Sequence, residues 1–129
     1  MDDARLKKNA RPIRDPLVRL EMIRGVEYEC DASRYGFSET ETHVGVDAQD
    51  VEAAGIPGAV VLAPFDVDRR GGGGSASGKH YMMVRYDKLV PLLIEAVKEL
   101  TCTVGALTCT VDELKGTVNE LKAAIDSNK

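Results

Sequence analysis

The chain ends in the stretch DKLVPLLIEAVKELTCTVGALTCTVDELKGTVNELKAAIDSNK, residues 87–129, and this stretch decides the fold. Its apolar residues follow one another at spacings of three and four, which is the a/d pattern of a coiled coil over about five heptads. Val or Ile fills every a position, and Leu fills every d position. We call this row of residues the seam; its members are Val90, Leu93, Val97, Leu100, Val104, Leu107, Val111, Leu114, Val118, Leu121 and Ile125.

The seam predicts that the tail associates with other helices. A globular helix usually ends after about 8 to 20 residues, whereas this one would form a rod of roughly 60 Å. Asp87 is the expected N-cap, and Pro91 falls in the first turn, where its missing N–H costs little. Because many residues outside the seam are Thr or Gly, we expect the seam to hold the helix together and an unpartnered tail to be largely disordered. In parallel coils, β-branched residues at a with Leu at d favour two strands.

Composition sets limits on the rest of the chain. Its 129 residues correspond to one domain by length, and the part before the tail can bury only a small core. We therefore expect an α+β fold with two parts: a small mixed globular part with a β-hairpin over residues 1–86, and a long helical coiled-coil segment over residues 87–129. The net charge of −4 argues against a nucleic-acid partner. No apolar stretch approaches the ~20 residues that span a bilayer, so we expect a soluble chain.

The globular part is expected to mix short helices and strands. Proline, glycine and alternating apolar residues mark the boundaries of these elements. In order, the predicted elements are a short helix capped by Asp15, with Pro16 at its first position and Gly25 at its C′ position; a strand over 26–30; a turn over 31–36; an extended piece within 37–46; a helix over 48–54 stopped by Gly55; and two strands over 59–65 and 80–86 joined by a long loop.

The loop over 66–79 contains a partial nucleotide-binding pattern. Gly73, Gly78 and Lys79 fit the G-x-x-x-x-G-K part of a phosphate-binding loop, but His80 replaces the Ser or Thr that holds magnesium. A strand is expected after the loop, whereas phosphate binding needs the N-terminus of a helix. A flexible, solvated hairpin loop is therefore the favoured interpretation.

Cysteine and histidine give no pattern of a metal site. The three cysteines have neither metal-ligand spacing nor a disulfide framework, and Cys102 and Cys109 fall on the outer f positions of the heptads. His43 and His80 lack a neighbouring acidic or cysteine pattern, so both are expected to be structural or surface residues. We expect no metal and no cofactor.

Several motifs together resemble a known family. In chain order they are Asp2 to Asn9 (DDARLKKN), Arg11 to Ile13 (RPI), His43 to Val51 (HVGVDAQDV) and Tyr86 to Leu100 (YDKLVPLLIEAVKEL). Together they are similar to the intramolecular chaperone, or peptidase S74, domain that ends phage tail fibres, tailspikes and endosialidases, with a related domain in myelin regulatory factor. The resemblance covers roughly Asp2 to Leu100.

The resemblance implies a function. Domains of this family form homotrimers, help the preceding fibre or tailspike domain of the same polypeptide to fold, and then release themselves by self-cleavage. The cut falls just before the serine of a Ser-Asp-x-Arg-Leu-Lys motif and is made by a Ser–Lys dyad, so the family acts as a self-cleaving serine endopeptidase. The implied place of action is the host cell cytoplasm during virion assembly, and the released domain is absent from the mature fibre.

Carried onto this chain, the resemblance assigns the dyad lysine to Lys7. Asp3, Arg5 and Leu6 match their motif positions, but Asp2 stands where the nucleophilic serine belongs. If one extra residue is tolerated, that position is instead Met1. In either alignment the nucleophile is missing, so we expect an inactive chain that represents the released or cleavage-blocked form of the domain.

Two other functions stay open at this stage. The chain could be a non-catalytic trimerisation domain of a viral fibre, in which an aspartate at position 2 is natural. It could also be a nucleotide-regulated domain that uses the loop from Gly73 to Lys79.

Overall fold

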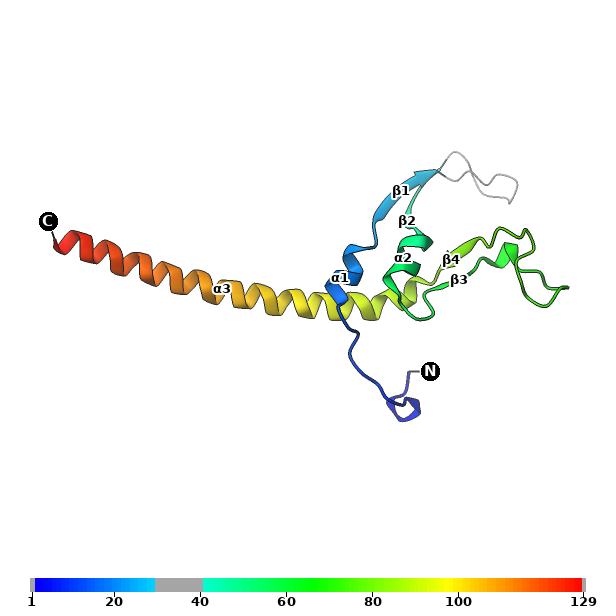
Figure 1. Cartoon of the computed structure of the whole chain (residues 1–129), viewed down its shortest axis with the longest axis horizontal. Coiled ribbons are helices and arrows are strands. Elements are labelled where there is room, and N and C mark those ends of the chain that lie inside the picture. The colour runs from blue at the N-terminus through cyan, green and yellow to red at the C-terminus, as the bar shows by residue number, and fades with distance from the viewer. Residues whose placement is uncertain (1, 30–40, 129) are drawn as a thin grey trace.

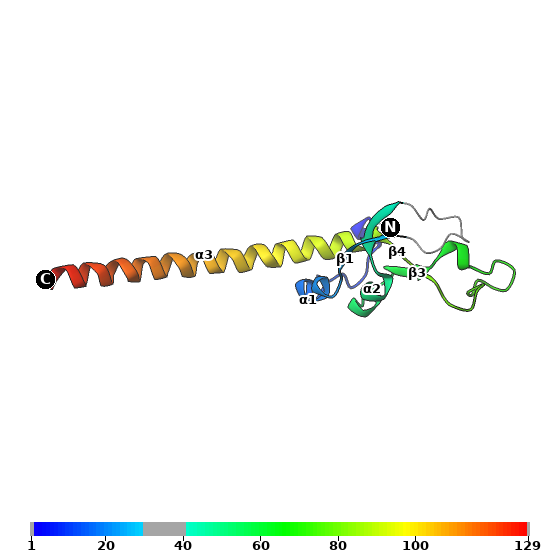
Figure 2. The same cartoon turned by 90° about the horizontal axis from the view of Figure 1, so that it is seen from above.

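The computed structural model describes residues 2–29 and 41–128. A small globular part is attached to one end of a long helix, α3 (Leu89–Ser127, 39 residues), which extends far beyond it (Figures 1 and 2). The expected mixed fold, with hairpins and a long C-terminal helix, is confirmed. No helix within the described ranges is both long and apolar enough to cross a membrane.

The globular part contains two short antiparallel sheets. Strand β1 (Gly25–Glu29) pairs with β2 (Thr42–Val46), with Gly25 opposite Val46 and Tyr28 opposite His43. Strand β3 (Val60–Leu62) pairs with β4 (Met82–Val84). In the sequence, α2 (Ala48–Ala54) lies between the two sheets. The predicted hairpin over 59–65 and 80–86 is thus confirmed, with shorter strands. The predicted turn over 31–36, the start of the second extended piece and Cys30 lie outside the described residues.

Helix α2 has the predicted bounds. It ends because Gly55 takes the left-handed conformation (φ 71°) and donates its N–H to the carbonyl of Glu52, a backbone geometry that costs glycine little. The helix buries Val51 and Ala54 and packs on β3 and β4. Val51, Ala59 and Leu89 form the centre of the core, and the partly buried residues around them are Ile23, Val46, Ile56, Val60 and Val84.

Helix α1 (Pro16–Glu21) begins with proline after the N-cap residue Asp15, as predicted, but its predicted C-terminal end is wrong. Asp15 takes the left-handed conformation (φ 50°), and its side chain makes no capping hydrogen bond. Gly25 is not a C′ residue: the helix ends at Glu21, and Gly25 opens β1 because pairing with Val46 continues the sheet to that residue. Helix α1 packs on α3, where the backbone N–H of Leu17 donates to Glu99 Oε2 at 3.3 Å.

The connection from β4 to the N-terminus of α3 also differs from the prediction. Asp87 is not the N-cap, because Tyr86–Lys88 form a 3-10 turn (η4) that runs directly into the helix. The Tyr86 hydroxyl accepts a hydrogen bond from Val46 N–H at 3.1 Å and so joins β2 to the base of α3. A Cβ atom on Gly45 would lie 2.7 Å from this hydroxyl, which explains glycine at that strand position. Pro91 lies in the first turn of α3, as predicted.

Candidate functional site

The first candidate site is the seam of α3, which the structure leaves uncovered. Every seam residue is between 45% and 62% exposed, from Leu93 at one limit to Ile125 at the other. This exposure persists along the whole helix, including the turns that lie beside the globular part. A row of large apolar side chains exposed over such a length is unusual for a monomer and is typical of a protein–protein contact surface.

The base of α3 carries a second apolar face, which sequence reasoning missed. Leu89, Leu92 and Ala96 are buried on the globular side of the helix, at g and c positions of the heptads. The sequence contained a signal for this face, because later g positions mostly hold Thr and later c positions mostly hold Glu. Because the chain's own core occupies this face, the seam beside it stays free for another helix.

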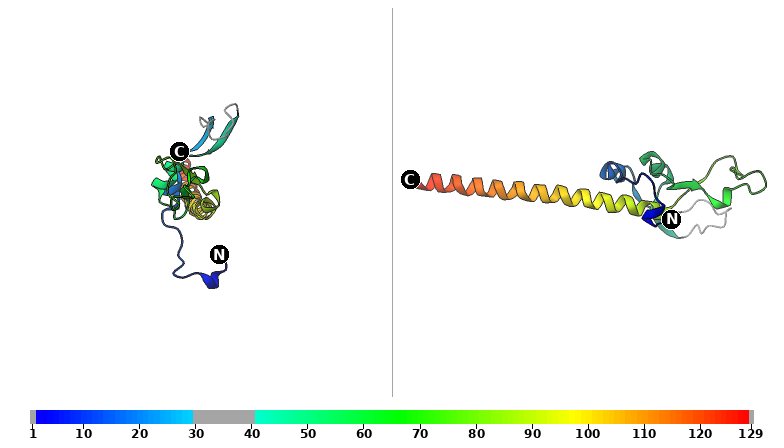
Figure 3. Two further views of the ribbon diagram at one scale, coloured as in Figure 1. Left: turned by 90° about the vertical axis from the view of Figure 1, so that its right-hand side faces the viewer. Right: turned by 90° about the horizontal axis from the view of Figure 1, so that it is seen from below.

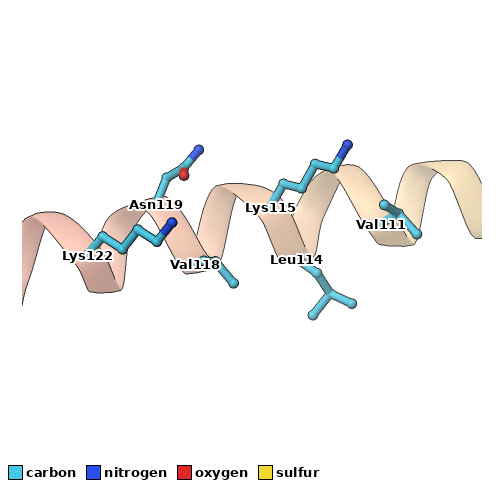
Figure 4. Close-up of a pocket in the computed structure, with 6 residues that line it drawn as sticks. All are labelled: Val111, Leu114, Lys115, Val118, Asn119 and Lys122. Atoms are coloured by element: carbon cyan, nitrogen blue, oxygen red, sulfur yellow. The ribbon is translucent and has the colours of Figure 1, made fainter.

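Figure 4 shows how the seam is separated from the polar side of α3. Leu114 and Val118 point away from the side chains of Lys115, Asn119 and Lys122. The hollow that these residues line with Val111 is the open surface of a single helix. It is therefore part of a contact face rather than a small-molecule site.

The flanks of the seam are threonines whose hydroxyls are already satisfied. Each hydroxyl donates to the backbone carbonyl four residues earlier in the same helix, as Thr101 does to Val97 at 2.8 Å. The residues with this contact are Thr101, Thr103, Thr108, Thr110 and Thr117, all at e or g positions. With the hydroxyl bound in this way, threonine can be enclosed at a helix–helix contact without an unpaired polar group.

The second candidate site is the N-terminal motif. Residues Ala4–Leu6 form one 3-10 turn (η1), which Asp3 caps by accepting the N–H of Arg5 at 2.9 Å. The Arg5 guanidinium also binds the Asp3 carboxylate at 2.6 Å, and this contact lowers the pKa of Asp3. The turn is held at the end of an extended segment, on the other side of α3 from the sheets (Figures 1 and 3). The motif is thus ordered locally but not packed into the core.

The structure places Lys7 and Asp2 on the surface of this segment. Both are exposed, and Lys7 uses its backbone N–H to bond the carbonyl of Ala4 at 3.1 Å. A lysine that acts as a base must be kept neutral by burial or by nearby cations, and in the single chain Lys7 is not buried. The sequence has no Ser, Thr or Cys among residues 1–29, so no nucleophile precedes or follows Lys7 in this segment.

The glycine-rich loop is organised by a buried aspartate, Asp66, rather than by a ligand. The Asp66 carboxylate accepts hydrogen bonds from the Ser75 hydroxyl at 2.6 Å and from the N–H groups of Ser77 and Tyr81 at 2.8 and 3.0 Å. These bonds, the Ser75 hydroxyl first, lower the pKa of Asp66 to about 2, although burial opposes the shift. The expectation of a flexible loop is therefore corrected: its second half is fixed to Asp66.

This arrangement also argues against the nucleotide interpretation. Gly73 donates its N–H to the carbonyl of Asp68, and the N–H groups of Gly78 and Lys79 bind the hydroxyls of Ser75 and Ser77. The amides that would hold a phosphate are thus occupied, and the next element is a strand.

The remaining candidate residues are the histidines and cysteines. Within residues 2–29 and 41–128, no group of acidic, histidine or cysteine side chains could hold a metal ion. The ring of His43 lies against Tyr28, with 5.5 Å between ring centroids, and His80 binds the carbonyl of Gly78 through Nδ1. Cys102 and Cys109 are free and exposed on α3.

Comparison with known proteins agrees with the motifs. Residues 3–61 match the family model described as the chaperone of endosialidase (Peptidase_S74). The predicted resemblance is confirmed over this range, which includes the N-terminal motif from Asp3 onwards, both strands of the first sheet and α2. The part of the resemblance assigned to Tyr86–Leu100 lies beyond the matched segment. No curated protein matches the chain.

Proposed function

We propose, from the match of residues 3–61 to the chaperone of endosialidase family, that this chain is a C-terminal intramolecular chaperone of a viral fibre or tailspike. It associates through α3 as a homotrimer and helps the preceding domain of the same polypeptide to fold, in the host cytoplasm during virion assembly. The observation that carries the proposal is the uncovered seam, which begins at the base of the globular part and runs to the end of α3.

The proposal divides the chain into two parts. Residues 1–86 would form the globular chaperone part, which includes the matched segment 3–61, and residues 87–129 would form the coiled-coil segment. Beyond Ala96, α3 has no buried residue within the described part of the chain. A helix of middling propensity that packs on nothing is unstable alone, so association through the seam is what would stabilise it.

We propose that three helices, rather than two, form the coiled coil. The a and d residues alone favour a dimer, but the flanks of the seam argue for a more enclosed arrangement. Thr101, Thr103, Thr108 and Thr110 are uncharged and internally bonded, and e and g positions are better enclosed in a three-stranded coil than in a two-stranded one. The family resemblance points to the same number.

A trimer of this kind would assist folding by alignment. A long parallel β-structure must close large loops and find its register before its contacts form. Joining three chains at one end raises their local concentration and sets a common register. The upstream segment would then fold from the joined end.

The proposed chemistry of release is a Ser–Lys dyad that involves Lys7, with Asp2 at the position of the missing serine. Because Lys7 is exposed on a segment outside the core, the site would be completed only when a neighbouring chain or the preceding domain covers this segment. Cleavage would then report assembly. Without the serine, this chain does not cut.

A second candidate function is a non-catalytic trimerisation domain that stays attached to its fibre. The absence of Ser, Thr and Cys from residues 1–29 favours it. In that case Asp3 only caps the N-terminal turn, and Asp2 and Lys7 are surface residues.

One experiment separates the two functions. We would measure the intact mass of a fusion that carries an upstream β-fibre segment and the change Asp2→Ser, beside the same fusion with Lys7→Ala. The neighbouring exposed lysine provides the control variant Lys8→Ala. A new N-terminus at residue 2 that is lost only with Lys7→Ala supports the dyad. Uncut fusions that still form trimers support the non-catalytic function.

A further inference from the structure

The base of α3 is bordered by an apolar hollow of about 420 Å³. Leu20 and Ile23 from the α1 side and Val46 from β2 form one wall of this hollow. The other wall is the start of α3 and the turn before it, with Tyr86, Leu89, Val90 and Leu93. The Tyr86 hydroxyl is bound to Val46 N–H, and the surface of the hollow is mostly apolar. It is open to the same side as the seam, because Val90 and Leu93 belong to both.

The hollow lies on one flank of the seam. Its lining residues on α3 occupy the a, d and g positions, and Leu89 is the g residue at its floor. In a parallel coiled coil, the g residue of one helix faces the e residue of the following heptad on its neighbour. For Leu89 that residue is Ile94 of a second copy of this chain.

Ile94 occupies an e position of the heptads and differs from the residues at all later e positions. The later e residues are Thr101, Thr108, Lys115 and Lys122, so Ile94 is the apolar member of the series. It is 53% exposed in the single chain. Because it is turned about 140° from Leu89 around the helix, Ile94 cannot reach the hollow of its own chain.

We propose that Ile94 of one protomer inserts into the hollow beside Leu89 of the next protomer, and so fastens each globular part to the neighbouring helix. This inference rests on the self-association proposed above and adds its register and orientation. An antiparallel pair would carry the globular parts at opposite ends, out of reach of Ile94. In a closed parallel ring, each chain inserts its Ile94 into the hollow of one neighbour, and its own hollow holds Ile94 of the other neighbour. The coil and the globular parts then assemble together.

Cysteine pairs test the contact directly. In a background with Cys30→Ser, Cys102→Ser and Cys109→Ser, we would introduce Ile94→Cys with Leu20→Cys and oxidise the protein. We expect covalent multimers on a denaturing gel, up to the size found by light scattering. The control pair is Ile94→Cys with Val18→Cys, because Val18 is 61% exposed and does not line the hollow; this pair should stay monomeric on the gel.

A milder variant guards against misfolding of the cysteine protein. Ile94→Thr introduces the residue found at the next two e positions, and we expect the dissociation constant of the assembly to rise at least about tenfold, since a buried isoleucine is lost from each contact. The control Val18→Thr should leave it unchanged. An oligomer that forms no Leu20-dependent crosslink, or that is insensitive to Ile94→Thr, overturns this inference alone. A monomer at all concentrations overturns the proposed function as well.

Discussion

At the scale of single residues, Asp66 organises the loop of the second hairpin. It is 2% exposed, and its two carboxylate oxygens accept one hydroxyl and two backbone N–H groups from residues 75–81. A buried carboxylate is stable only when such donors surround it. Its position just after β3 therefore ties the far side of the loop to the start of β4.

We predict that Asp66→Asn loosens this loop. The amide offers one acceptor oxygen and places an N–H₂ group against donors that the carboxylate now accepts, so hydrogen exchange at the amides of Ser77 and Tyr81 should accelerate at least about tenfold. The control is Asp68→Asn, because the exposed turn at Asp68 uses a single oxygen for the N–H groups of Arg70 and Gly71, which an amide retains. Equal exchange in the two variants would contradict the role of Asp66.

The same residue sets a pH dependence. Its pKa is lowered from 3.8 to about 2 in the folded chain, so its stabilising contribution is complete above about pH 4 and is lost as the pH falls towards 2. Amide protection of the loop in the unaltered protein should follow this window. In the Asp66→Asn variant, amide protection of the loop should not change between about pH 4 and pH 2.

At the scale of elements, we predict that the double change Leu107→Asp and Leu114→Asp prevents association. Charges replace two leucines per chain that the proposed coil would bury, and the loss of about 1.5–3 kcal/mol for each leucine raises the dissociation constant more than about 100-fold. Light scattering and far-UV circular dichroism should show a monomer with little helix. In the fusion with Asp2→Ser, self-cleavage should also stop.

The outer face of the same helix supplies the matched control. Cys102→Asp with Cys109→Asp introduces the same two charges, also one heptad apart, at exposed f positions. This variant should keep its mass and helix content. Cleavage by a monomeric seam variant would contradict the coupling of release to assembly.

Elements with a local signal were predictable from the sequence. The bounds of α2 follow from its apolar spacing and from Gly55, and the exposed face of α3 follows from the heptads. The Asp66 network was not predictable, because its partners lie 9 to 15 residues away and leave no periodic pattern. For the same reason the end of α1 was wrong: pairing of Gly25 with Val46 is a long-range contact that overrides a local helix-stop signal.

For the candidate sites, too, the local features were predictable and the tertiary surroundings were not. The sequence located the seam and the N-terminal motif, but not their positions relative to the core. Leu89, Leu92 and Ala96 were not recognised as a second face of α3, since burial by α1 and α2 depends on the tertiary fold. The exposure of Lys7 was likewise beyond sequence reasoning, because a motif specifies residue types and not what covers them.

At the scale of the whole molecule, the single chain buries few of its large apolar side chains and exposes many. Its fully or nearly buried hydrophobic side chains within the described ranges are few, and the largest of them with no measurable exposure are Leu92 and Val51. A core of this size is marginal by itself. The long helix adds exposed apolar surface instead of burying it, so the association that we propose would supply stability that the single chain lacks.

We therefore predict that stability depends on protein concentration. Because association stabilises only the folded chain, the thermal midpoint and the helix content should both rise between about 1 and 100 µM. Circular dichroism melts over this range measure both quantities. The variant with Leu107→Asp and Leu114→Asp serves as the reference, since its midpoint should be low and independent of concentration. A midpoint that does not change with dilution in the unaltered chain would mean that the globular part and α3 are stable alone, which contradicts a helix held by its seam.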